Sequence, residues 1–309
     1  MRRWQKIIRN RKLWLALAIV ALLCVLLRTP GTDLRDGRHD RGRNGLALCA
    51  AWIADDPWFD ATGRASDKSR YREGTAELGR AIRENHIAEV FLEIPPPDGE
   101  GALHGLDAAR TEALLYECYE SRTWARIAVP ASGVADLRWR RFFLVDLRRL
   151  LDRHPRLQGV QLDCSRIADG EPAIFALIDE LGPLLAPDRR LVSIIPGAWG
   201  ETCFREAARR ADGLAITLDF RSSLAARLTP SKIPARIAEA HARCEGRPVL
   251  FRIPGDDRLR RALRALHLGL GKQQLPEPYQ GILIETADAP TPVMWRELRE
   301  HFLQPALAK

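Results

Sequence analysis

The 309-residue chain has six cysteines and seven histidines, but none of them stands at the spacing of a metal site. The sequence contains no C-x-x-C pair and no H-x-x-x-H pair, so a structural zinc site is not expected. It also lacks the G-x-G-x-x-G and G-x-x-x-x-G-K-[ST] loops, which argues against nucleotide binding by those loops. The sequence therefore predicts no metal and no cofactor.

The charge of the chain is concentrated at its N-terminus. The formal net charge is +8, and residues 1–28 contain seven basic residues and no acidic ones. Removing these seven charges leaves a net charge of only +1 for residues 29–309. A nearly neutral body gives no electrostatic reason to expect DNA or RNA binding, so no nucleic acid is predicted as a partner.

One long apolar run lies between these basic residues. Residues 13–27 carry no charge, and as a helix they would span about 22 Å, with Lys12 and Arg28 able to extend to the bilayer surface. The alternative is a cleaved signal peptide, whose apolar region has a similar length, but no small-residue cleavage site follows. We therefore predict an uncleaved transmembrane signal-anchor at residues 13–28.

The positions of the basic residues also predict a topology. Residues 1–12 should stay in the cytoplasm by the positive-inside rule. The rest of the chain then lies on the far side of the membrane, which in a bacterium is the periplasm. Residues 29–44 are rich in glycine and charge and are predicted to be a flexible tether. The prediction is a single-pass protein of a bacterial inner membrane, with protein partners in the envelope as one option.

Eight short apolar runs follow residue 44, and segments with helical periodicity separate most of them. Such runs are typical of strands buried on both faces of a parallel sheet. Eight strands alternating with helices predict an α/β fold, a (β/α)8 TIM barrel over residues 45–309, with a doubly wound open sheet as the alternative. The predicted strands are residues 46–53, 88–94, 124–129, 157–163, 190–195, 213–219, 247–253 and 281–286.

Carboxylates stand at several predicted strand ends, where barrels of this kind carry their chemistry. Glu93 and Glu285 directly follow apolar residues, so their side chains should begin inside the barrel. A buried carboxylate needs a partner or has a raised pKa. Arg126 or Arg252 could pair with them, and a purely structural ion pair is an alternative to catalysis. The other strand-end carboxylates, some of which could be turn formers or helix caps, are Asp55, Asp56, Asp163, Asp219 and Asp256.

Tryptophans also fall near the strand ends. Trp52 and Trp199 lie at or just beyond them, and an indole face can stack on the apolar face of a sugar while carboxylates bind its hydroxyls. This combination predicts a carbohydrate site, with a role in capping the barrel core as the alternative for both rings. The predicted substrate-binding residues are Trp52, Trp199, Asp55 and Arg252.

The fourth strand resembles that of the family-18 glycoside hydrolases, the chitinase-like barrels. The family's strand ends in D-G-x-D-x-D-x-E, and residues 158–165 read Q-G-V-Q-L-D-C-S in the same frame. Gly159 and Asp163 match, whereas Ser165 stands where the family has its proton donor. The family's M-x-Y-D on the sixth strand is reduced here to Asp219 in I-T-L-D, and its tryptophan on the eighth strand is replaced near Glu285.

The resemblance implies a barrel over roughly residues 45–300 that acts on a glycan. It also implies that substrate-assisted hydrolysis is lost, because the hydroxyl of Ser165 cannot serve as a general acid near neutral pH. The remaining carboxylates could support hydrolysis by a carboxylate pair, with Asp163 as base or nucleophile and Glu93 or Glu285 as acid. The predicted catalytic residues are Asp163, Glu93, Asp219 and Glu285.

Two functions follow from these predictions. The first is a membrane-anchored glycoside hydrolase-like barrel that acts on or binds envelope or exported polysaccharide. The alternative is a catalytically inactive barrel that serves as a glycan-binding or protein-interaction scaffold in the cell envelope. A third and weaker interpretation is binding of a phosphorylated metabolite. The segment after the eighth strand, however, has no glycine-rich loop that could bind a phosphate.

Overall fold

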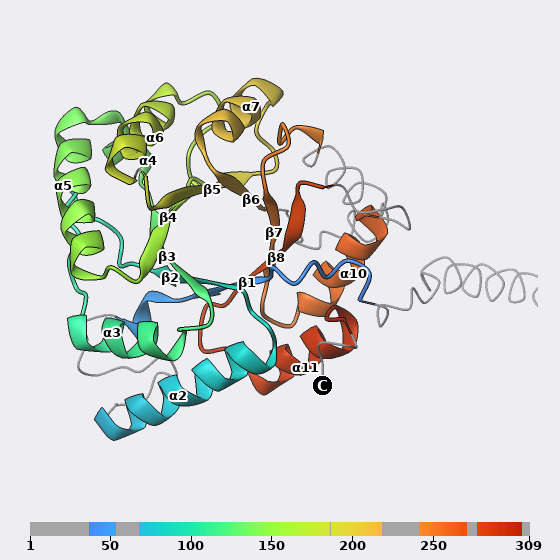
Figure 1. Ribbon diagram of the computed structural model, residues 1–309. Helices are drawn as coiled ribbons and strands as arrows, with labels where there is room; N and C mark the ends of the chain where they lie inside the picture. The colour runs from blue at the N-terminus through green and yellow to red at the C-terminus, as the bar shows by residue number, and fades with distance from the viewer. Residues whose placement is uncertain (1–36, 54–67, 186, 218–241, 271–276, 305–309) are drawn as a thin grey trace, which may run out of the picture. The chain divides into compact units, whose positions relative to one another are not determined.

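The computed structural model describes residues 37–53, 68–185, 187–217, 242–270 and 277–304 (Figure 1). Eight parallel strands form a closed barrel in the order in which they occur along the chain, and helices surround it. The strands are β1 (Gly45–Leu48), β2 (Glu89–Glu93), β3 (Arg122–Ala128), β4 (Leu157–Asp163), β5 (Arg190–Pro196), β6 (Gly213–Thr217), β7 (Val249–Pro254) and β8 (Tyr279–Glu285).

Pairing between the first and last strands decides between the two predicted architectures. β1 lies parallel to β8, with Gly45 opposite Leu283 and Ala47 opposite Glu285. An open doubly wound sheet would leave these two strands as edges. The predicted (β/α)8 barrel is therefore confirmed, and the open-sheet alternative is wrong.

The first strand is shorter than the prediction of residues 46–53. β1 ends at Leu48, and residues Ala50–Trp52 form the 3-10 helix η2. The N–H groups of Trp52 and Ile53 donate to the carbonyls of Cys49 and Ala50, as in a tight helical turn. A continuous apolar run does not distinguish a buried strand from a buried helical turn, and this ambiguity explains the error.

Helices follow most strands and agree with the predicted periodic segments. Asp107 caps α3 by accepting from two backbone N–H groups, and Asp136 caps α5 by accepting from the backbone N–H of Arg138. α6 begins at Pro172, a residue suited to a first helical turn. Residues 232–244, which also have helical periodicity in the sequence, lie largely outside the described residues. The described helices are α2 (Lys68–Glu84), α3 (Ala108–Glu117), α4 (Ala131–Ala135), α5 (Leu137–Arg153), α6 (Pro172–Leu185), α7 (Glu201–Arg210), α10 (Leu259–Leu270) and α11 (Pro292–His301).

The interior of the barrel is filled by side chains rather than open. Phe91 and Trp124 stack there with ring centroids 5.8 Å apart, and six smaller apolar side chains complete the cluster. Gly159 gives Trp124 its space, because a Cβ at this position would lie 2.6 Å from the Cζ3 atom of the indole. The glycine of the fourth-strand motif therefore has a packing role here.

The predicted tether at 29–44 is wrong for residues 37–44. Asp40 is buried, and its carboxylate accepts from the backbone N–H of Gln304 at 3.1 Å and from the side-chain amide of Asn44 at 2.9 Å. The hydroxyl of Tyr279 donates to the His39 carbonyl at 2.8 Å. These contacts make residues 37–44 part of the barrel domain, whose start lies before the predicted residue 45.

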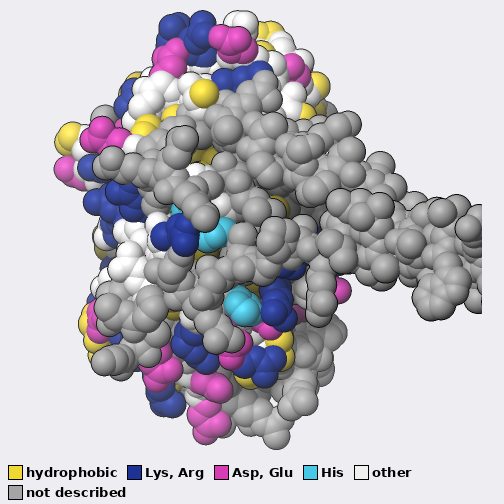
Figure 2. Space-filling model, turned by 90° about the vertical axis from the view of Figure 1, so that its right-hand side faces the viewer, with side chains coloured by type: hydrophobic (Ala, Val, Ile, Leu, Met, Phe, Trp, Pro, Cys, Tyr) yellow, Lys and Arg dark blue, Asp and Glu magenta, His cyan; other side chains and the backbone are white. Residues whose placement is uncertain are grey.

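The predicted membrane anchor lies outside the described residues. Residues 13–28, the basic segment 1–12 and residues 29–36 all lie outside the described residues. Within the described ranges, no helix has both the length and the apolar character that a bilayer span requires. Over the described part of the face in Figure 2, Lys and Arg side chains lie among Asp and Glu side chains, in keeping with the small net charge of residues 29–309.

Candidate functional site

A cavity of about 280 Å³ opens at the C-terminal ends of the strands. Its lining brings together side chains that lie far apart in the sequence, between residues 93 and 285. They come from β2, β3, β4, β7 and β8 and from the segments that follow β2, β3 and β4. The described residues that line it are Glu93, Pro96, Pro97, Arg126, Ala128, Val129, Pro130, Asp163, Ser165, Arg166, Arg252 and Glu285.

The charged lining residues share the inward face of the barrel strands. Residues two apart on a strand point to the same side. Phe91 and Trp124 fill the interior, so Glu93 and Arg126 face the interior nearer the C-terminal end. Three more polar side chains lie two residues beyond a member of the interior cluster and so face the interior as well. They are Thr217 after Ala215, Arg252 after Leu250 and Glu285 after Leu283.

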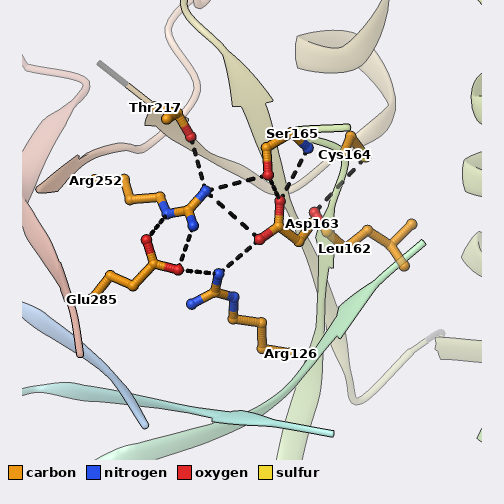
Figure 3. A network of polar contacts seen from close by, with 8 residues as sticks. All are labelled: Arg126, Leu162, Asp163, Cys164, Ser165, Thr217, Arg252 and Glu285. Atoms are coloured by element: carbon orange, nitrogen blue, oxygen red, sulfur yellow. Dashed lines mark hydrogen bonds and ion pairs between the residues drawn. The ribbon is translucent and has the colours of Figure 1, made fainter. Parts of the chain in front are cut away.

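Two arginines and two carboxylates form an ion-pair network in this cavity (Figure 3). The Nη2 atom of Arg126 lies 2.7 Å from Oδ2 of Asp163 and 2.5 Å from Oε1 of Glu285. Arg252 binds Glu285 through two nitrogens, with its Nε atom 2.7 Å from Oε2. The structure thus brings Asp163 and Glu285 together. The sequence offered Arg126 or Arg252 as a partner for Glu93 and Glu285, and among the described residues both arginines pair with Glu285.

Ser165 holds Asp163 in place from the other side. Its backbone N–H donates to Oδ1 of Asp163 at 3.0 Å, and its hydroxyl donates to the same oxygen. Arg252 extends the network by donating from Nη1 to the hydroxyl oxygens of Ser165 at 3.3 Å and Thr217 at 3.2 Å. Both oxygens of Asp163 therefore accept from partners, and its side chain is only 6% exposed.

The three carboxyl groups of the cavity have different electrostatic environments. Burial raises the pKa of Glu93, and the negative charges of Glu285 and Asp163 add to this effect, which Arg126 only partly offsets. Burial also acts against ionisation of Asp163 and Glu285. The positive charges of Arg126 and Arg252 outweigh it, however, and hold the pKa of each carboxyl below its usual value. Glu93 forms no ion pair or side-chain hydrogen bond within the described part of the chain.

The ion pairs also limit which carboxyl groups can face each other across a substrate. Asp163 and Glu285 contact the same nitrogen, so their nearest oxygens are at most about 5.2 Å apart. This is close to the ~5–5.5 Å separation of retaining glycosidases, but the guanidinium of Arg126 lies between them. Among the three carboxyl groups of the described lining, a pair that flanks a substrate must therefore include Glu93.

Comparisons with known proteins bear on the fold alone. No protein-family model matches the sequence, and no curated protein matches it at a significant level. The spore cortex-lytic enzyme SleL of Bacillus cereus superposes with a TM-score of 0.57 at 10% identity, over 84% of this chain and 74% of that one. A chitinase of Rhizomucor miehei superposes with a TM-score of 0.51 at 10% identity, over 84% of this chain and 99% of that one. The fold resembles that of the chitinase-like glycoside hydrolases.

Other glycoside hydrolase families share the same barrel. The GH99 endo-alpha-mannosidase of Bacteroides thetaiotaomicron has a TM-score of 0.51 at 10% identity, over 81% of this chain and 84% of that one. The fold therefore agrees with the predicted resemblance but does not select one sugar or one reaction.

Trp52 and Trp199, the predicted stacking residues, lie in the hydrophobic core. They are 6% and 3% exposed, and neither lines the cavity. Trp199 donates its indole N–H to the Ile167 carbonyl at 3.2 Å, and Trp52 is the buried last residue of η2. This placement favours the alternative that both rings cap the barrel core.

The other predicted residues fall into three groups. Arg252 lines the cavity, but Glu285, Ser165 and Thr217 occupy all three of its nitrogens, so it positions the network rather than presenting free donors. Asp256 accepts from the backbone N–H of Arg258 at 2.9 Å, which matches the turn-forming alternative. The third group, Asp55, Asp56 and Asp219, lies outside the described residues.

Sequence reasoning did not find every functional candidate in the cavity. The sequence pattern predicts Arg126 only as an ion-pair partner, and it does not single out Thr217, which contacts Arg252 outside the lining, or Arg166. The alternation of inward and outward side chains along β3 and β6 was the available signal for the first two. Within the described ranges, no group of three or more acidic, His or Cys side chains has a geometry that could hold a metal ion.

Proposed function

We propose that this protein is a glycoside hydrolase-type enzyme, anchored to a bacterial inner membrane, that acts on envelope or exported polysaccharide with Glu93 as its proton donor. The observation that carries this proposal is that one cavity holds two carboxylates paired with arginines, Asp163 and Glu285, and a third carboxyl, Glu93, without an ion-pair partner among the described residues. The pKa is accordingly raised for Glu93 and lowered for the other two. Carboxyl groups whose pKa values are pushed apart in this way are suited to acid and base roles.

Glu285 is the better candidate for the second carboxylate. Its side chain is 32% exposed, whereas that of Asp163 is 6% exposed and both of its oxygens accept hydrogen bonds. In this mechanism Glu285 attacks the anomeric carbon while Glu93 transfers its proton to the departing glycosidic oxygen. A water molecule then loses a proton to Glu93 and cleaves the glycosyl ester, which releases the sugar and restores Glu285. Arg126 and Arg252 keep Glu285 ionised and favour its departure in the second step.

The proposed location rests on the sequence. The uncharged run at 13–27 and the basic residues before it support a retained anchor with the barrel in the periplasm. Reconstitution of the full chain in vesicles tests this topology. Because residues 1–12 and the barrel should lie on opposite sides of the membrane, protease added outside should digest only one of the two in each vesicle. Release of the intact barrel from carbonate-washed membranes would contradict the anchor.

Turnover tests the catalytic assignment. The full-length protein in neutral detergent is incubated with peptidoglycan and with neutral and acidic polysaccharides, and new reducing ends are identified by mass spectrometry. Glu93→Gln should lower turnover by roughly 10²–10⁴-fold, the usual contribution of a general acid, and Glu285→Gln should also abolish most of it. Glu73→Gln is the matched control, because Glu73 is an exposed residue of α2 outside the cavity lining. Unchanged turnover in both cavity variants would overturn the assignment.

A specific observation favours the second candidate, an inactive barrel that binds a glycan or a protein partner. Ser165 replaces the acid of the resembled motif, and its hydroxyl is used to hold Asp163. Asp163 and Glu285 are also both engaged by arginines. Binding of a glycan without any product would support this candidate and would rule out the enzymatic proposal.

A further inference from the structure

Arg126 has hydrogen-bonding capacity that the ion-pair network does not use. Its side chain is only 5% exposed, and Nη2 alone contacts Asp163 and Glu285. Its Nη1 and Nε atoms form no hydrogen bond within the described part of the chain (Figure 3). A guanidinium has five N–H donors, and neither of these nitrogens is among the fully buried polar atoms that lack a partner, so their donors stay accessible. Arg126 lines the cavity, so a ligand there can reach these donors.

A second arginine, Arg166, lines the same cavity. It follows Ser165 in the loop after β4, its side chain is exposed, and it forms no ion pair with any carboxylate of the described residues. Arg126 is therefore a buried cation and Arg166 an exposed one in the same cavity. Arg252 is different, since it donates from all three nitrogens.

The lining of the cavity suits a charged ligand better than a neutral sugar. Its described residues include three arginines and three carboxyl groups, so the lining carries a net charge of +1 with Glu93 protonated and of 0 with Glu93 ionised. They include no aromatic side chain, so a sugar ring has no stacking surface among them. Charge-assisted hydrogen bonds to an anion are stronger than those to a neutral hydroxyl.

We infer that the glycan bound in this cavity carries an anionic group, a carboxylate or sulfate on the sugar, which Arg126 and Arg166 bind. The inference rests on the proposed function only in taking the cavity as the glycan site. An anion on Arg126 would also offset the positive charge that lowers the pKa of Glu93. Bound substrate would thus favour the protonated form that the proposed mechanism requires.

Calorimetric titration of the full-length protein in neutral detergent tests the inference. The probes are three oligosaccharides of one length, namely oligogalacturonate, its carboxyl-reduced neutral form and a sulfated galactan. At least one anionic probe should bind roughly tenfold more tightly than the neutral one, and the preference should shrink at high salt because of screening. The anionic probe that binds more tightly shows whether the cavity prefers a carboxylate or a sulfate.

Substitution of the exposed arginine separates this inference from a general effect of charge. Arg166→Gln should weaken binding of the anionic probe about three- to fivefold, as for an exposed ion pair, and should leave the neutral probe unchanged. Arg141→Gln is the matched control, since Arg141 is an exposed residue of α5 that does not line the cavity. Equal effects of the two variants would overturn the inference.

The outcomes also distinguish this inference from the proposed enzymatic function. Binding of an anionic probe without any turnover overturns the enzymatic proposal and supports the inference. Turnover of the neutral probe, without tighter binding of an anionic probe, supports the enzymatic proposal and overturns the inference. Absence of binding of all three probes overturns the inference.

Discussion

Replacing Arg126 with glutamine removes a positive charge that both Asp163 and Glu285 contact directly. The Nη2 atom lies within 2.7 Å of both carboxylates, and Arg126 and Asp163 are 5% and 6% exposed. Breaking a buried ion pair by removing one partner typically costs about 3–5 kcal/mol, because the other charge remains buried. We therefore expect Arg126→Gln to lower the free energy of unfolding by about 3–5 kcal/mol at pH 7.

The loss should depend on pH in a defined direction. The pKa values of Asp163 and Glu285 are lowered in the folded protein, so these groups stabilise the fold above the pKa of the unfolded chain. That contribution disappears as the pH falls through the folded values. Without Arg126 the pKa values of the same carboxyls should be less strongly lowered. The difference in the free energy of unfolding between wild type and variant should therefore be largest near pH 7 and should shrink in acid.

Urea denaturation of the full chain in neutral detergent, followed by tryptophan fluorescence at neutral and acidic pH, measures this difference. Arg141→Gln serves as the surface control. The double variant Arg126→Gln/Asp163→Asn should recover part of the stability, since the neutral amide needs no counter-charge. A loss below about 1 kcal/mol, the size of an exposed ion pair, or a loss of constant size at all pH values would refute the electrostatic reasoning.

Three further predictions concern the motif glycine, the N-terminal segment and the pH profile. Gly159→Ala should destabilise the barrel by at least about 1–3 kcal/mol, as measured by thermal unfolding, because its Cβ would lie 2.1 Å from the Arg190 carbonyl oxygen; an unchanged unfolding temperature would contradict this packing role. Asp40→Ala should cost about 1–3 kcal/mol, because it leaves the N–H of Gln304 without its partner, and faster amide exchange near residue 304 should accompany the loss. Turnover should fall on the alkaline side as Glu93 loses its proton, at a pH above the usual carboxyl range because its pKa is raised. A pH–rate profile without that alkaline limb would exclude Glu93 as the acid.

The placement of the strands was predictable because burial and alternation are local properties of the chain. Seven of the eight predicted runs coincide with strands to within a few residues at each end. The first run failed because apolar composition continues from β1 into the helical turn of η2. Inward-facing positions were also readable, since Glu93 and Arg126 lie two residues beyond side chains that fill the barrel interior.

The tertiary structure decided which of these charged groups meet. Arg126 and Glu285 are 159 residues apart in the chain, and they come into contact only because the barrel closes. Strand positions do not reveal that Glu93 has no ion-pair partner within the described chain, because this depends on how Arg126 and Arg252 divide their donors between the other two carboxylates. Nor do they reveal the burial of Trp199, which depends on its packing against Phe175 of α6.

The sequence by itself therefore determined seven of the eight strands and placed Glu93 and Glu285 inside the barrel, because both follow from the apolar residues along a short stretch. Only the tertiary structure decided the division of the carboxyl groups in the described lining into two that are ion-paired and one that has no ion-pair partner among the described residues. The physical reason is that a pKa depends on distances to charges and to solvent, and in this protein the closure of the barrel sets those distances.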